Sequence, residues 1–313
     1  MAQSYAQISI LANGTSASVP SPVNPPQNPR TACKGWTADA ARRNDRFLQS
    51  IRFNELTGQP WALTLTIPAA DSGRGKLPEP REYHSMLRAM IERLRRMGAI
   101  RWHWVIEMTS RKTPHVHASV WFGAADSSRS LKIQSAWLSI AEKHGLKCSA
   151  AAQCVKPMTS SGWAQYTSKH GARGVKHYQR LLSSLPDSWA EPGRMWGYGG
   201  DWMTADARRP ERRSVSRANF WKYRRLVRSW CVSNARKTRN ERLRRKYITQ
   251  ARRMLKCSNS KLSPVKPVNV WIPETITRQF LAMLETSEYI PLESRIEAVQ
   301  RAEIMADWKR YLK

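Results

Sequence analysis

Residues 100–122 read IRWHWVIEMTSRKTPHVHASVWF, and this stretch decides the fold. Two apolar runs flank a polar segment at 109–114 that is typical of a turn. The pattern predicts two adjacent antiparallel strands joined as a hairpin. Because the side chains of a strand alternate between its two faces, Glu107 is expected close to His115 across the turn.

The flanking sequence adds further strands and helices. Residues 61–67 (WALTLTI) alternate Thr with apolar residues, as in a half-buried strand. Pro80 begins a run of apolar residues at helical spacing, which Gly98 ends. The predicted elements are strands at 61–67, 100–108, 115–122, about 150–157 and 194–198, and helices at 80–97, about 129–144 and about 160–170. Their order, β-α-β-β-α-β plus a helix and a strand, predicts an α+β fold with a ferredoxin-like, RRM-like antiparallel sheet and helices on one face.

Composition divides the chain into four parts. Five prolines lie among Ser, Asn and Gln between positions 14 and 29, which disfavours regular structure there. Helical patterning returns late in the chain, at 274–286 and 292–312. The predicted parts are a flexible leader at 1–45, a compact domain at 46–200, a basic and mainly helical extension at 201–260, and a linker with an amphipathic helical tail at 261–313.

The charge of the chain indicates a nucleic-acid partner. Its 313 residues carry 53 Lys plus Arg against 23 Asp plus Glu, a net charge of +30, which is far more than solubility requires and argues against an ordinary small-metabolite enzyme. Residues 201–260 hold 19 basic and 4 acidic residues. They predict a surface for the DNA backbone; the alternative is a solvated basic helix packed on the first domain. The candidate DNA contacts are Arg194, Arg212, Arg213, Arg217, Lys222, Arg224, Arg225 and Arg228.

Cysteine usage and hydropathy predict a cytoplasmic protein. The five cysteines include no close CxxC pair, which fits reduced thiols. No apolar run approaches the roughly 20 residues of a membrane span. The first basic residue is Arg30, so the N-terminus lacks the basic region of a signal peptide. We therefore expect no membrane association.

The His-Val-His sequence at 115–117 is a candidate metal site. Positions i and i+2 of a strand point to the same face, so His115 and His117 offer two imidazole ligands side by side. Glu107 on the neighbouring strand is a candidate third, oxygen ligand, and such a mixed site suits Mg²⁺ or Mn²⁺. The alternatives are an incidental histidine pair and an exposed carboxylate near Arg111 and Lys112.

Tyr166 and Lys169 are candidate catalytic residues. On the predicted helix they lie three positions apart, on the same side. A tyrosine hydroxyl can attack phosphorus, and a nearby lysine can favour the phenolate or hold the phosphate. Tyr166 follows His117 by 49 residues, with one helix and one strand between them, which would bring this helix over the histidine-bearing face. The alternative is a tyrosine that only packs.

In order and spacing, these motifs resemble those of the HUH endonuclease superfamily, specifically rolling-circle replication initiators of small plasmids and filamentous bacteriophages. The resemblance covers about 60–200. It includes 63–66 (LTLT), the HUH strand at 114–117, the nucleophile helix at 166–169, and a Gly-Arg-x-Trp-Gly stretch at 193–197. Two features depart from some members. His170 follows Lys169 where the two-tyrosine subgroup continues toward a second tyrosine, and no GxxxxGK[ST] motif indicates a fused helicase.

The resemblance implies a site-specific single-strand DNA endonuclease and ligase that initiates rolling-circle replication. His115, His117 and Glu107 would hold Mg²⁺ or Mn²⁺. Tyr166 would form a covalent 5′-phosphotyrosine and free a 3′-OH, while Lys169 contacts the phosphate or favours the phenolate. Partners would be single-stranded and duplex DNA at an origin, with host helicase and polymerase, in the bacterial cytoplasm. Termination requires a second nucleophile, which either Tyr178 or a second protomer could supply. The alternative for Tyr178 is a packing residue near His177.

Two other functions fit parts of the sequence. A plasmid-mobilisation relaxase or a single-strand transposase would use the same chemistry, although the order of histidines before tyrosine favours an initiator. A non-enzymatic basic module could instead bind RNA by stacking bases on its sheet. That function requires Trp102, Trp104 and Trp121 to face outward.

Overall fold

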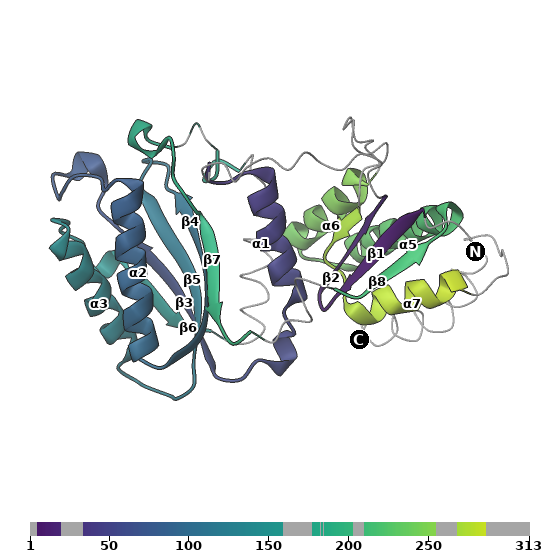
Figure 1. Cartoon of the computed structure of the whole chain (residues 1–313), viewed down its shortest axis with the longest axis horizontal. Coiled ribbons are helices and arrows are strands. Elements are labelled where there is room, and N and C mark those ends of the chain that lie inside the picture. Colours follow the sequence, from purple (N-terminus) through teal and green to yellow (C-terminus); the bar gives the residue numbers. More distant parts are fainter. Residues whose placement is uncertain are drawn as a thin grey trace.

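In a computed structural model of the chain, two antiparallel sheets lie on either side of helix α1, Ala38–Ser50, in a mixed α+β fold (Figure 1). The structure describes residues 5–19, 34–158, 177–181, 183, 185–202, 210–254 and 268–285. We call the described part of 34–202 the five-stranded lobe. The four-stranded lobe comprises 5–19, 210–254 and 268–285.

The sheet of the five-stranded lobe has the order β6-β3-β5-β4-β7, and each neighbouring pair is antiparallel. The predicted hairpin is confirmed, with Glu107 directly opposite His115. The strands are β3 (Gln59–Thr66), β4 (Ala99–Met108), β5 (Pro114–Phe122), β6 (Cys154–Pro157) and β7 (Trp196–Gly200). The predicted strand at 150–157 is shorter than expected because Ala150–Ala152 forms a 3₁₀ turn before β6.

Helices α2 (Pro80–Arg96) and α3 (Arg129–Lys143) cover one face of this sheet, as predicted (Figure 1). Pro80 stands at the start of α2, where a missing N–H costs no hydrogen bond. The side chains that fill this layer follow the helical and alternating spacings of the sequence. They include Tyr83, Met86, Leu87, Met90 and Leu94 of α2, and Leu63, Leu65, Val116, Ala118 and Val120 of the strands.

Two glycines of β7 permit close packing of tryptophans on this same face. Gly197 and Gly199 are the register partners of Trp104 and Trp102. A Cβ atom on either glycine would lie within 2.7 Å and 2.5 Å, respectively, of an indole carbon. The glycines of the 193–200 stretch therefore leave room for two large side chains of β4.

Helix α1 covers part of the opposite face of the sheet and lies against both lobes. Its Phe47 stacks on Tyr198 with ring centroids 3.8 Å apart, and Asn44 Oδ1 lies 2.7 Å from Nε2 of the buried His103. Toward the other lobe, Asp45 accepts a 2.8 Å hydrogen bond from the indole of Trp271. The expectation of helices on one face only was therefore incomplete.

The four-stranded lobe corrects the prediction of a flexible leader. Within 1–45, residues 6–18 form a hairpin in the centre of a sheet with the order β8-β1-β2-β9. The prediction was wrong here because the apolar residues of β1 pack on helix α5, which lies more than 200 positions later. The strands are β1 (Ala6–Leu11), β2 (Gly14–Ser18), β8 (Arg212–Val215) and β9 (Val268–Val270).

Helices α5 (Arg217–Lys237), α6 (Glu241–Arg253) and α7 (Glu274–Glu285) complete this lobe (Figure 1). Side chains of Ser216 and Asn240 cap the first two, and α7 confirms the helix predicted at 274–286. The helices predicted at 160–170 and 292–312 lie outside the described residues. Further 3₁₀ turns span Phe53–Glu55, Ala70–Ser72 and Asp187–Trp189.

Among the described helices, none combines the length and the apolar character needed to cross a lipid bilayer.

Candidate functional site

The paired strands bring the predicted metal ligands to one face. Glu107 of β4 and His115 of β5 are register partners, and Thr64 of β3 is the partner of His117. Register partners point to the same face of a sheet, which here is the face opposite α2 and α3. The structure thus assembles all three predicted ligands in one place.

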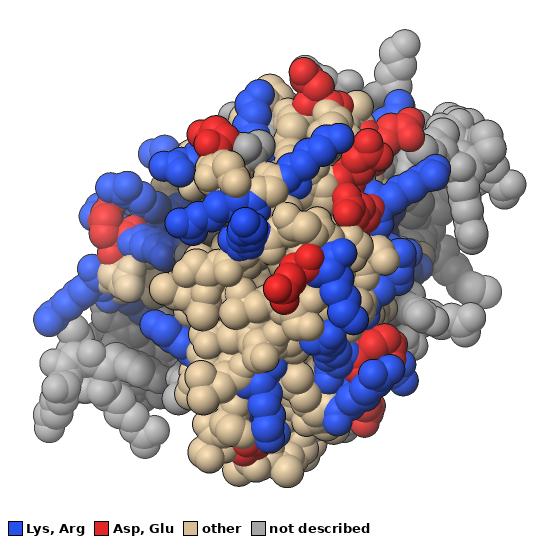
Figure 2. Space-filling view, turned by 90° about the vertical axis from the view of Figure 1, so that its left-hand side faces the viewer, with Lys and Arg blue, Asp and Glu red and all other residues tan. Residues whose placement is uncertain are grey.

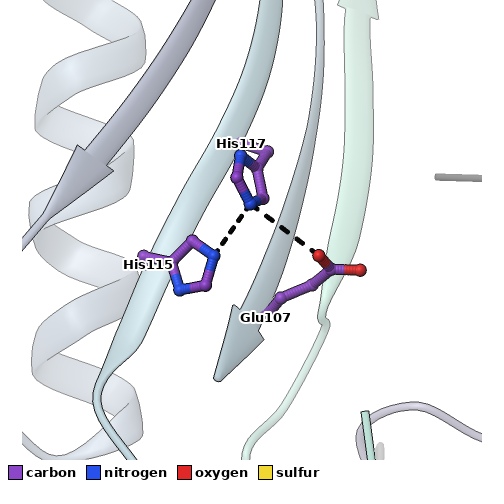
Figure 3. Close-up of side chains that lie close together, drawn as sticks. All are labelled: Glu107, His115 and His117. Carbon is purple, nitrogen blue, oxygen red and sulfur yellow. Dashed lines mark hydrogen bonds and ion pairs between the residues drawn. The ribbon is translucent and has the colours of Figure 1, made fainter. Parts of the chain in front are cut away.

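The three side chains point toward one another (Figure 3). Nε2 of His115 lies 2.8 Å from Nε2 of His117, and that nitrogen lies 3.8 Å from Oε2 of Glu107. Their ligand atoms all lie within 4.8 Å of one another. Glu107 and His115 are buried, and His117 is partly accessible, so the group opens toward solvent on the side of His117.

Thr64 orients one of the two imidazoles. Its hydroxyl oxygen lies 2.9 Å from Nδ1 of His117. When Nδ1 donates its hydrogen to Thr64, Nε2 carries the lone pair of the ring nitrogens and directs it at the other two ligands. Thr64 belongs to the LTLT stretch of the sequence, whose role in the site was not specified by the pattern.

The donor set fits a divalent cation. Two imidazole nitrogens and one carboxylate oxygen converge, and three protein ligands leave coordination positions for water or a substrate oxygen. The predicted alternative for Glu107, an exposed carboxylate near Arg111 and Lys112, was wrong, because its side chain is 0% exposed. The three residues therefore form a candidate site for a divalent metal ion.

Sequence reasoning missed Arg180. Its Nε donates a 2.8 Å hydrogen bond to Oε1 of Glu107 in a buried ion pair. The two residues are 73 positions apart, and no spacing or motif connects them. Only the folded chain reveals that Glu107 has a guanidinium partner as well as two imidazole neighbours.

The predicted catalytic residues Tyr166 and Lys169 lie outside the described residues. Tyr178, the other tyrosine considered, is described. Its ring lies 4.8 Å from that of His177, but the residue is 58% exposed. Tyr178 thus contacts His177 as expected, but much of its side chain is accessible to solvent.

The candidate DNA contacts fall in two regions. Arg194 is exposed and precedes β7 in the five-stranded lobe, whereas the other seven candidates lie on β8 and α5 of the four-stranded lobe. Of those seven, Lys222 is half-buried and five are exposed, namely Arg212, Arg213, Arg217, Arg225 and Arg228. Helix α6 adds exposed residues that the candidate set omitted, namely Arg242, Arg244, Arg245 and Arg252.

Arg224 is the exception in this set, because its side chain is buried between helices. Its Nη2 donates to the carbonyl of Met254, and its guanidinium lies 5.6 Å from the ring of Phe220. A guanidinium held in this way stabilises the contact between α5 and the end of α6. We therefore correct the candidate set and remove Arg224 from it.

At the junction of the lobes, Arg46 of α1 is close enough to Arg212 of β8 for their charges to interact. Burial, and then the positive charge of Arg212, lower the pKa of Arg46. Nε and Nη2 of Arg46 are buried and have no hydrogen-bond partner among the residues that the structure describes. An anion near this pair would relieve the repulsion.

The face of the five-stranded lobe that bears α2 and α3 does not have one sign of charge. Figure 2 shows Lys and Arg side chains there interspersed with Asp and Glu. Arg95 and Glu92 of α2, for example, form an exposed ion pair. This distribution differs from that of residues 210–254, which hold 16 basic and two acidic residues.

The tryptophans required by the RNA-binding alternative do not face outward. Trp102 and Trp104 pack on the helix-covered face of the sheet, and Trp121 is 2% exposed, beside Trp202. The central strands therefore lack the stacking platform that this alternative needs.

Known proteins resemble this chain in sequence. The profile of the family described as Replication-associated protein ORF2/gene 2 protein matches residues 60–171. The replication-associated gene 2 protein of Pseudomonas phage Pf3 is 34% identical over 267 residues, which cover 84% of this chain and 90% of the phage protein. A predicted replication protein of Xylella fastidiosa strain 9a5c is 39% identical over 268 residues, with the same two coverages. No solved structure matches the chain.

Proposed function

The chain belongs to the replication-associated protein family of the ORF2/gene 2 protein type, and from this premise we propose that it is a metal-dependent endonuclease that nicks one DNA strand to initiate rolling-circle replication. Family membership implies a role in phage or plasmid replication. The proposal adds the reaction, the catalytic residues and the partners.

The observation that carries the proposal is the Glu107, His115 and His117 group on the face of the sheet opposite α2 and α3. The strand order β6-β3-β5-β4, with α2 and α3 as connections, is the order expected of a split βαβ, ferredoxin-like core. Both features support an HUH-type nicking core, extended by β7.

Tyr166 is the proposed nucleophile, on the sequence argument alone. Its hydroxyl oxygen would form a bond to the scissile phosphorus while the bond from phosphorus to the 3′ oxygen breaks. The product is a 5′-phosphotyrosine, and the 3′ oxygen leaves as an alkoxide that becomes a hydroxyl by taking up one proton, which balances the proton that the tyrosine hydroxyl gives up. Lys169 would hold the phosphate or favour the phenolate. Since one ester replaces another, the step conserves bond energy and needs no ATP.

The metal site would bind the scissile phosphate. A bound Mg²⁺ or Mn²⁺ would polarise that phosphate and compensate its developing charge. His115 and His117 would supply the nitrogen ligands and Glu107 an oxygen ligand, while Thr64 holds the ring of His117 in orientation. The accessible side of His117 is where the DNA backbone would enter.

Single-stranded DNA could follow the same face of the sheet toward β7. Val105 is the register partner of both His117 and Trp196, so these side chains form one row across the strands. Tyr198, two residues further on, is 42% exposed and available to stack a base. Arg194 would contact a phosphate nearby.

The four-stranded lobe would hold the duplex at the origin. The exposed arginines of β8, α5 and α6 provide the charge for contacts to the DNA backbone, and Arg46 with Arg212 would place one such contact at the junction. Host polymerase would then extend the freed 3′-OH while a host helicase separates the strands, in the bacterial cytoplasm. Relaxases and single-strand transposases share the chemistry, but family membership favours replication initiation.

A cleavage assay tests this function. The purified full chain is incubated with Mn²⁺ and single-stranded oligonucleotides tiled across the replicon that encodes it. We expect one oligonucleotide to be cut and its 3′ portion to remain on the protein, with mass spectrometry locating the adduct on Tyr166. The Y166F variant should bind the same oligonucleotide without forming the adduct, whereas Y178F, the matched control, should still form it. An adduct that persists in Y166F would reject Tyr166, and the absence of any cleavage would reject the endonuclease.

A further inference from the structure

Arg180 and Glu107 form an ion pair that is closed off from solvent. Their side chains are 1% and 0% exposed, and Nε of Arg180 lies 2.8 Å from Oε1 of Glu107. Burying two charges is costly unless the pair is well placed and further hydrogen-bonded, so its presence at a site of function calls for a reason other than stability.

Arg180 is held in place through its neighbours, which bond to the two residues of β4 that flank Glu107, namely Ile106 and Met108. Its central carbon lies 3.9 Å from the centre of the Trp36 ring, and the indole N–H of Trp36 donates a 2.8 Å bond to the carbonyl of Ile106. On the other side, the N–H of Met108 donates a 3.0 Å bond to the carbonyl of Gln179. The two chain neighbours of Glu107 thus anchor the ring beneath Arg180 and the backbone beside it.

This arrangement gives the two oxygens of the Glu107 carboxylate different partners. Oε1 is bound by Arg180, and Oε2 lies 3.8 Å from Nε2 of His117. A carboxylate fixed in this way presents one oxygen to the imidazoles and cannot turn to offer both. Proteins usually orient the side chains that bind a metal through hydrogen bonds to residues that do not themselves touch the metal.

We propose that Arg180 is a positioning residue for the metal site: it holds the Glu107 carboxylate so that only Oε2 faces His115 and His117. The inference rests on the proposed function only in taking these three residues as metal ligands. It concerns cation binding and does not depend on whether the protein cuts DNA.

Whether the removal of Arg180 weakens or strengthens cation binding distinguishes a positioning role from a purely electrostatic one. Arg180 carries a positive charge near a cation site, so its removal alone would strengthen cation binding. If Arg180 orients Glu107, removal instead weakens binding, because the carboxylate is free to turn away. The loss of an outer partner of this kind costs roughly 10- to 100-fold in metal affinity.

The test measures the Mn²⁺ dissociation constant of the full chain without DNA, from the electron paramagnetic resonance signal of free Mn²⁺. The variants are R180M, E107Q and the double variant R180M/E107Q. We expect R180M and E107Q each to weaken binding about 10-fold or more, and the double variant to be no weaker than E107Q alone. R180K, which keeps the charge but not the planar guanidinium, should be intermediate.

R129M is the matched control. Arg129 is also buried and also lies over an aromatic ring, 4.0 Å from the centre of Phe122, but it donates to the carbonyl of Ala124 instead of to a carboxylate. R129M should leave the Mn²⁺ affinity unchanged. Thermal melting of each variant identifies any that fail to fold. If R180M fails to fold, the same comparison of single and double variants is made with R180K and R180K/E107Q.

Three results would overturn the proposal. Tighter Mn²⁺ binding in R180M would show a purely electrostatic effect, and losses that add up in the double variant would show that Arg180 acts independently of Glu107. A wild-type chain that binds no Mn²⁺ would remove the metal site itself. A chain that binds Mn²⁺ with the expected cycle and yet cuts no DNA would refute the nicking function and leave the role of Arg180 standing.

Discussion

The hydroxyl oxygen of Thr64 lies 2.9 Å from Nδ1 of His117, across the pairing of β3 with β5. This contact settles which nitrogen of His117 is directed at Glu107 and His115. A threonine in a repetitive strand sequence thereby becomes part of the candidate metal site.

We predict that T64V weakens Mn²⁺ binding by roughly 10- to 100-fold, because the imidazole of His117 loses the partner that fixes its orientation. T64S, which keeps the hydroxyl, should retain most of the affinity. Titration of Mn²⁺ against the folded variants measures both.

The control for this substitution is T66V. Thr66 lies on the same face of β3, but its hydroxyl donates to the carbonyl of Ala152 at 3.3 Å and not to a histidine. Equal losses in T64V and T66V would mean that the strand, not the contact with His117, determines the affinity.

Replacing Tyr198 should weaken the binding of single-stranded DNA. Its ring stacks on Phe47 and lies 6.1 Å from the ring of Trp196, and the residue is 42% exposed, so a base would contact the exposed part of this aromatic group. Stacking on an aromatic ring is worth about 1–3 kcal/mol per base. We expect Y198A to lose affinity on this scale in fluorescence anisotropy, with Y198F near wild type. Unchanged DNA affinity in Y198A would exclude this path for the strand.

Arg225 and Arg228 should contribute to the salt dependence of duplex binding. Both are exposed on α5, and each phosphate contact changes the slope of log K against log salt by about 1. R225A/R228A should therefore reduce the slope by about 2. R224M is the comparison, because the buried Arg224 should affect the melting temperature and leave the slope unchanged. A reduced slope in R224M would contradict the assignment.

The burial of Tyr223 should make the stability of the four-stranded lobe fall at alkaline pH. The two hydroxyl oxygens are 2.6 Å apart, and burial raises the pKa of Tyr223 from 10.0 to about 12. Above pH 10 the unfolded chain releases this proton and the folded chain retains it. The contribution is thus complete below pH 10 and is lost as the pH rises through about 12.

The variant Y223F tests this dependence. At neutral pH it should cost about 1 kcal/mol in the free energy of unfolding, because a buried hydrogen bond is lost. Its stability should also fall less steeply than that of the wild type between pH 10 and 12. Parallel curves from denaturant titrations across this pH range would contradict the prediction.

The sequence was most informative where partners are close along the chain. The hairpin of β4 and β5 follows from two apolar runs around one turn, and the position of Glu107 opposite His115 follows from strand alternation alone. The helix from Pro80 was equally legible, since apolar spacing and a terminal glycine act locally. The candidate metal site could be predicted because its three residues all belong to one hairpin.

Long-range packing was beyond the sequence. Arg180 forms an ion pair with Glu107, which lies 73 positions earlier in the chain, and the guanidinium of Arg180 packs on the indole of Trp36. The N-terminal hairpin was missed because nearby prolines dominated the composition, although residues 6–11 (AQISIL) carry an apolar strand signal of their own. Whether Tyr166 approaches the histidines stays a prediction.

The central position of β1 and β2 in their sheet has a consequence for biosynthesis. This hairpin is synthesised long before its neighbours β8 and β9, which follow about 200 and 250 residues later. Until then both edges of the hairpin present unpaired backbone groups, a common route to aggregation. Because β8 and β9 follow the five-stranded lobe in the chain, that lobe is synthesised before the four-stranded sheet can close around its own first strands.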